Sequence, residues 1–167
     1  MTWDAPADFV AVFDTTAASA TPTAFINTSH ISTSGFGKEA NKYHKIEFDC
    51  AYYVPSGCTY VSSGIIYTDN TGNIDSVNAN NTTISSTGAI TVGVSKIIVA
   101  ANKKYLLFTE DDNGNKYNNQ IMVSITNMGF EKTRKARAYL VYKDSNNELH
   151  VVYSSGTAQV TTPAWNG

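Results

Sequence analysis

Apolar and polar side chains alternate in short blocks along this chain. The clearest block spans residues 43–54, and alternate positions of an extended strand share one face. One face of this block carries the apolar residues Ile46, Phe48, Cys50, Tyr52 and Val54. The other face carries Lys45, Glu47 and Asp49. The pattern predicts a half-buried β-strand.

Similar blocks predict the remaining strands. They lie at residues 8–14, 23–27, 65–69, 90–100, 106–110, 120–128, 136–144 and 148–154. Turns rich in Asn and Gly follow three of them, at 70–73, 111–115 and 145–147, and these residues supply the positive φ that hairpin turns need. The tracts 15–21 and 75–88 are rich in small polar residues and are expected to be loops with no core of their own. A single turn at 38–41 is the one helical signal.

The lack of long amphipathic helices in this pattern indicates the fold class. About nine short strands separated by turns are typical of a sandwich or barrel, whereas a parallel α/β fold needs helices between its strands. A chain of 167 residues is long enough to form one hydrophobic core that stabilises the whole domain. We therefore expect a single all-β domain over residues 1–167, built as an immunoglobulin-like, two-sheet antiparallel β-sandwich. Residues 1–42 would add an N-terminal strand and loops.

Several short segments carry a family resemblance. They are Lys-Ile-Glu-Phe at 45–48, Val-Pro-Ser-Gly-Cys-Thr at 54–59, Ser-Gly-Ile-Ile-Tyr at 63–67, Ala-Arg-Ala-Tyr-Leu-Val-Tyr at 136–142 and Val-Val-Tyr-Ser at 151–154. From residue 43 to 155 the chain resembles a β-sandwich module common near the C-terminal ends of large surface proteins of gut Firmicutes. The last two segments also look like the closing strands of immunoglobulin-like and fibronectin type III-like folds. Cys58 departs from the module, which more often has an aromatic residue there.

Charge and hydropathy exclude two classes of partner. The formal net charge is -2 and 16% of the residues are charged, which gives no electrostatic reason to expect nucleic acid binding. The basic residues Lys132, Arg134, Lys135 and Arg137 are expected to form a solvated strand edge. No apolar run approaches the roughly 20 residues of a membrane span, so we expect no membrane insertion. Residues 1–10 lack the pattern of a signal peptide, which suits a module excised from a longer exported protein or a virion protein.

The sequence offers no catalytic residues. His30, His44 and His150 do not match a zinc-binding spacing, and Ser154-Ser155-Gly156 lacks the strand-to-helix setting of a nucleophile elbow. Most acidic residues lie in predicted turns or on solvated strand faces. We therefore expect a protein that is not an enzyme.

Two turns have the composition of calcium loops. Residues 69–75 and 110–115 place oxygen ligands around a glycine, and the candidate ligands are Asp69, Asn73, Asp75, Asp111 and Asn113. Plain hairpin turns are the favoured alternative, because such turns use the same residue types. Apart from calcium, no cofactor is expected. Cys50 and Cys58 flank the corner at 54–57 and could form a disulfide, the alternative being two buried thiols.

Aromatic residues supply the candidate ligand-binding surface. In the strand at 136–142, alternation places Arg137 and Tyr139 on the face opposite the small and aliphatic residues. If that second face is solvated, these two residues form an exposed patch. Tyr67 and Tyr153 are further candidates for ligand binding. Such a patch could stack on a sugar ring or contact a partner protein.

Three functions fit these features. The leading interpretation is a non-catalytic module of a bacterial surface protein, extracellular or at the cell surface, used for adhesion, glycan binding or spacing. The second is a phage virion component, a capsid decoration or tail protein, for which a homo-oligomer is expected. The third is a carbohydrate-binding module attached to a glycoside hydrolase or a cellulosome-like assembly.

Overall fold

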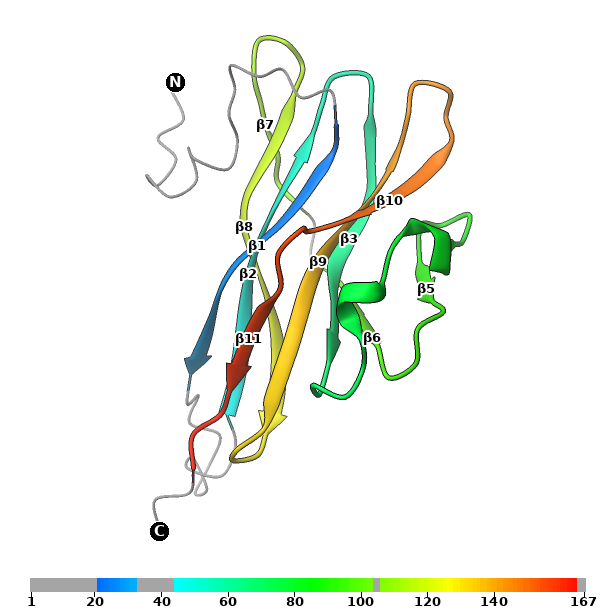
Figure 1. Cartoon of the computed structure of the whole chain (residues 1–167). Helices are drawn as coiled ribbons and strands as arrows, with labels where there is room; N and C mark the ends of the chain where they lie inside the picture. The colour runs from blue at the N-terminus through cyan, green and yellow to red at the C-terminus, as the bar shows by residue number, and fades with distance from the viewer. Residues whose placement is uncertain (1–20, 33–43, 104–105, 165–167) are drawn as a thin grey trace.

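A computed structural model describes residues 21–32, 44–103 and 106–164 (Figure 1). These ranges contain eleven β-strands and two short 3-10 helices. The elements are β1 (Thr23–Ser32), β2 (His44–Val54), β3 (Thr59–Thr68), η2 (Ile74–Ser76), η3 (Ala79–Asn81), β4 (Thr82–Ile84), β5 (Ile90–Val92), β6 (Ile98–Ala101), β7 (Thr109–Glu110), β8 (Lys116–Met128), β9 (Thr133–Lys143), β10 (Leu149–Tyr153) and β11 (Ala158–Thr161). The predicted strand at 8–14 and helical turn at 38–41 lie outside the described residues.

The strands form two main sheets and one small one. The first sheet has the order β1-β2-β8-β7, and the second has the order β10-β9-β3-β6. β11 pairs with the start of β9, so β10 and β11 share one edge of that strand. β4 and β5 pair only with each other among the described strands. Every pairing is antiparallel, which confirms the predicted all-β, sandwich-like fold.

The first core lies between the two main sheets. The apolar face predicted for residues 43–54 is buried in this core, and so are Ile65, Ala138 and Leu140. The buried residues of that face are Ile46, Phe48, Cys50, Tyr52 and Val54. The Tyr52 hydroxyl donates a hydrogen bond to the carbonyl oxygen of Gly64 at 2.9 Å. This bond satisfies the one polar atom that the ring takes into the core and links the two sheets.

The opposite face of β2 is less solvated than its sequence predicts. Lys45 and Glu47 form an ion pair on it. However, Asp49 is buried, Ala51 is fully buried, and Tyr53 packs against Tyr117 with 5.0 Å between ring centroids. The C-terminal half of β2 is therefore buried on both faces, not on one.

A second core covers the outer face of the second sheet. It contains Ile66, Tyr139, Val141 and Val151 from the sheet, and Ile74, Val77 and Ile90 from the segment between β3 and β6. That segment includes the tract 75–88, so the expectation that this tract has no core of its own is wrong. Figure 1 shows the segment, in green, beside β3, β6 and β10. The third sheet belongs to this insert.

Other differences from the predicted elements are small. The predicted strand at 90–100 is split into β5 and β6 by a turn in which Lys96 has a φ of 62°. Only Thr109–Glu110 of the predicted strand at 106–110 is extended and paired. The three predicted hairpin turns do contain residues with positive φ, namely Asn70, Gly114 and Asn147.

We expect Gly64→Ala to destabilise the protein. A Cβ atom at Gly64 would collide with the carbonyl oxygen of Ala100 and would lie 2.9 Å from both the Cα of Ala101 and the Cε1 of Tyr139. Overpacking of this kind lowers the free energy of unfolding by about 1–3 kcal/mol, measurable by urea denaturation. Gly156→Ala is the control, since a Cβ there has no neighbour within 4 Å. Equal stability of the two variants would contradict this packing.

Candidate functional site

Arg137 ties the insert to the second sheet. Its Nη1 donates to the carbonyl oxygens of Val77 at 2.8 Å and Ile74 at 3.2 Å, and its Nε donates to that of Ser154 at 2.9 Å. The guanidinium carbon lies 5.4 Å from the centroid of the Tyr153 ring. Burial lowers the pKa of Arg137, and nearby Asp75 opposes that shift. Arg137 therefore connects η2 and the end of β10 to β9.

The predicted exposed patch does not exist, because the insert covers that face. Tyr139 is only 1% exposed. Tyr153 is half-buried, packs 6.5 Å from the Tyr139 ring and shares a hydrogen bond of 2.8 Å with the hydroxyl of Thr82. Tyr67 is half-buried and packs against the first core. Alternation separated the two faces of β9 correctly, but both of them are buried.

The residues of the predicted calcium loop at 69–75 have separate roles. The Asp69 carboxylate accepts hydrogen bonds from the backbone N–H and the hydroxyl of Thr71. Asp75 pairs with Lys135 at 3.2 Å. Asn73 precedes η2 without a side-chain capping bond. Each feature is accounted for by a turn or by a contact with β9.

The second predicted calcium loop is also closed by its own hydrogen bonds. The Asp111 carboxylate accepts from the backbone N–H groups of Asn113 and Asn115, from Nδ2 of Asn115 and from the Tyr117 hydroxyl. These bonds lower the pKa of Asp111, the Asn115 side chain contributing most. Desolvation, followed by the charge of Asp111, raises the pKa of Tyr117 to about 12. Asn113 is exposed.

Both cysteines are free thiols. Cys50 lies in the middle of β2, is buried in the first core and directs its S–H toward the carbonyl oxygen of Phe48 at 3.9 Å. Burial raises the pKa of this thiol to about 12. Cys58 is half-buried just before β3, in the opposite sheet. The structure therefore contains the alternative of two thiols and not the predicted disulfide.

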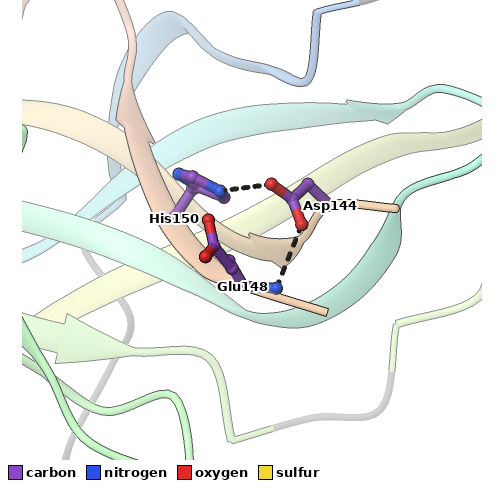
Figure 2. A group of neighbouring side chains, drawn as sticks. All are labelled: Asp144, Glu148 and His150. Atoms are coloured by element: carbon purple, nitrogen blue, oxygen red, sulfur yellow. Dashed lines mark hydrogen bonds and ion pairs between the residues drawn. The ribbon is translucent and has the colours of Figure 1, made fainter. Parts of the chain in front are cut away.

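A cluster that the sequence analysis missed lies at the β9–β10 turn (Figure 2). The side-chain ligand atoms of Asp144, Glu148 and His150 lie within 4.8 Å of one another. Asp144 Oδ1 accepts from the backbone N–H groups of Asn146 and Glu148, and Oδ2 lies 2.8 Å from His150 Nε2. The backbone N–H of Glu148 contributes most to the lowered pKa of Asp144, followed by the His150 side chain. The His150 ring stacks on Tyr142 with 5.3 Å between centroids.

Two carboxylates and an imidazole are ligands that divalent cations accept, so these three residues could hold a metal. Among the described residues they are the one group of three His, Cys, Asp or Glu side chains with that spacing. The bonds around Asp144 are also those of an ordinary hairpin turn, which needs no ion. The sequence could have predicted this cluster. Only the three turn residues 145–147 separate Asp144 from Glu148, and a hairpin at that turn brings His150 opposite the end of β9.

A groove of about 530 Å³ begins beside this cluster. It lies between β10 and β4, and its lining residues are Ala79, Thr82, Thr83, Ile84, Tyr142, Leu149, His150 and Val151. The bond between the hydroxyls of Thr82 and Tyr153 joins its two walls. His150 belongs both to the groove and to the cluster, so the acidic turn lies at the edge of the groove.

We expect Arg137→Met to loosen the insert. The variant leaves the carbonyl groups of Ile74, Val77 and Ser154 without the charged donor they now share, which costs about 2–3 kcal/mol of unfolding free energy. Faster amide exchange in η2 would accompany this loss. Lys135→Met is the control on the same strand, because it removes one partly exposed ion pair worth less than about 1 kcal/mol. Similar effects of the two variants would contradict the role of Arg137.

Asp111 should contribute a pH-dependent part of the stability. Hydrogen bonds, that of the Asn115 side chain above all, hold its pKa in the folded protein below the ordinary value of 3.8, so the ionised carboxylate stabilises the fold above that value. The contribution is lost as the pH falls through the lower, folded pKa. Asp111→Asn should therefore lower the melting temperature at neutral pH. Below pH 3.8 the difference in melting temperature between the variant and the original protein should become smaller. A difference in melting temperature that does not change with pH would contradict this role of Asp111. Asp112→Asn is the control, because Asp112 is an exposed neighbour.

Comparisons of the whole chain with protein-family models, curated proteins and solved structures give no match. Within the described ranges, no helix is long and apolar enough to span a lipid bilayer.

Proposed function

We propose that this chain is a non-catalytic binding module of an extracellular surface protein, with an adhesive role, and that the groove between β10 and β4 is its ligand-binding surface. The proposal rests on the groove itself, a shallow and open depression of about 530 Å³ between strands. Its two walls belong to different sheets, and the hydrogen bonds of Arg137 hold the insert that supplies one of them.

The chemistry of the groove lining supports binding. Leu149, Val151 and Ile84 offer apolar contact area, and Thr83 offers an exposed hydroxyl. The single imidazole is held between the carboxylate of Asp144 and the ring of Tyr142. Apolar contact area together with a few fixed polar groups is what a site needs to orient a ligand.

An extracellular setting is supported by the resemblance of residues 43–155 to surface-protein modules. The low charged fraction of 16% is compatible with that setting. A groove favours adhesion over a purely spacing role, because a spacer needs no concave surface.

We expect Thr83→Trp to block ligand binding. Thr83 is exposed and lines the groove, so an indole there would fill the space without disturbing either core. The labelled chain is first applied to a glycan array and to a displayed library of random linear peptides, and the retained ligands are measured against each variant. We expect Thr83→Trp to weaken binding at least about 10-fold, which corresponds to about 1.4 kcal/mol.

Gln159→Trp is the control, because Gln159 is also an exposed strand residue, lies on β11 and does not line the groove. It should bind as the original chain does. The proposed function would be contradicted if neither the glycan array nor the peptide library retained a ligand. It would also be contradicted if Thr83→Trp left the binding intact.

A further inference from the structure

We infer that the groove binds an extended polypeptide segment, which adds as a strand along the open edge of β10 and carries a Lys or Arg near the β9–β10 turn. The inference rests on the proposed function, that this groove is the ligand-binding surface, and it names the class of ligand.

β10 has backbone groups that its pairing with β9 leaves unused. It pairs with β9 along one edge only, within the part of the chain that the structure describes. The N–H of Ser154 donates to the carbonyl of Ala138, and the N–H of Asp144 donates to the carbonyl of Glu148. Hydrogen-bonded pairs alternate along an antiparallel ladder, so His150 and Val152 also bond to β9. The N–H and C=O groups of Leu149 and Val151 therefore point away from β9.

The opposite wall also has a free edge. Bonds from Ser85 N–H to the Ala89 carbonyl and from Gly93 N–H to the Asn81 carbonyl fix the register of β4 with β5. By the same alternation, the N–H and C=O groups of Ile84 point away from β5. β4 is the strand of this pair that lines the groove. The ligand strand pairs with β10 alone, because the 2.8 Å bond between the Thr82 and Tyr153 hydroxyls holds β4 too close to β10 for one strand to pair with both.

Side chains match the alternation of an extended ligand. Val151 is buried and Leu149 and Ile84 are half-buried, so they can contact every second side chain of an added strand. β10 contains five residues, Leu-His-Val-Val-Tyr, and lacks the Lys or Pro that commonly protects an edge strand from pairing. Five residues extend about 17 Å, which suits a short linear motif.

Charge favours a cationic residue at one end of the ligand. The carboxylates of Asp144 and Glu148 lie at the turn where β10 begins, next to His150 in the groove wall. The Glu148 side chain is exposed and available to an incoming cation. A Lys or Arg of the ligand beside Leu149 would meet both carboxylates.

The aromatic rings favour a peptide over a glycan. Stacking of a sugar needs an open ring face. Tyr142 is the one tyrosine in the groove lining, and the His150 ring stacks on one of its two faces. The backbone edge groups, in contrast, need a partner that alternates donors and acceptors, as a polypeptide does.

Amide exchange in the unbound protein tests the open edge. The amides of His150 and Val152 should exchange at least about 10-fold more slowly than those of Leu149 and Val151, because only the first two bond to β9. Equal protection of all four amides would overturn the open edge and the inference with it.

Backbone methylation of a bound peptide tests strand addition. The tightest peptide from the random linear library is resynthesised with one N-methyl group at a time and titrated against the protein. Methylation should weaken binding about 10-fold at alternate residues and little at those between, since only alternate amides face β10. Binding should also slow exchange at Leu149 and Val151. A loss that does not alternate would overturn strand addition.

The remaining outcomes separate this inference from the proposed function. Retention of glycans and no peptides, with Thr83→Trp still blocking, would overturn the polypeptide class and leave the groove as the binding surface. Failure of both ligand formats would overturn both. Glu148→Gln should weaken a Lys- or Arg-containing peptide about 3-fold, whereas Glu110→Gln, at an exposed acid on β7, should not. Equal effects of the two variants would overturn the cationic contact.

Discussion

The structure depends on how Arg137 is satisfied. A guanidinium that is withdrawn from water needs hydrogen-bond acceptors, and here three backbone carbonyl groups supply them. Two of those carbonyls belong to residues 74–77, so the same bonds hold the insert against the outer face of the second sheet. Tyr139 is buried as a consequence. The insert in turn places β4 beside β10, and without that placement the groove would have one wall.

Local sequence patterns predicted which side chains of a strand face the first core, and they predicted turns that have a fixed chemistry. The alternation in β2 identified its core-facing side chains, and Asn70, Gly114 and Asn147 adopt the positive φ expected of hairpin turns. The same rule failed for β9, because alternation separates two faces but does not say that both are covered. The insert was missed since Ile74, Val77 and Ile84 lie in or next to short elements without a strand or helix period.

The candidate site was less predictable for a related reason. The carboxylates of Asp69 and Asp111 were correctly located in turns, yet hydrogen bonds within those turns occupy them. The groove joins residues 79–84 to residues 142–151, and no local pattern relates segments so far apart in the chain. The cluster of Asp144, Glu148 and His150 is the exception, because one short turn brings its members together.

The groove depends on packing of the insert on Tyr139, and proton NMR measures that packing directly. We expect nuclear Overhauser contacts between the Tyr139 ring and the methyl groups of residues in the second core, with Ile74 and Val151 as the most informative. A soluble paramagnetic agent should leave the ring signals of Tyr139 sharp, since that side chain is 1% exposed. Broad Tyr139 signals without contacts to Ile74 would contradict it, because the insert would then not cover the sheet and the groove would lose its second wall.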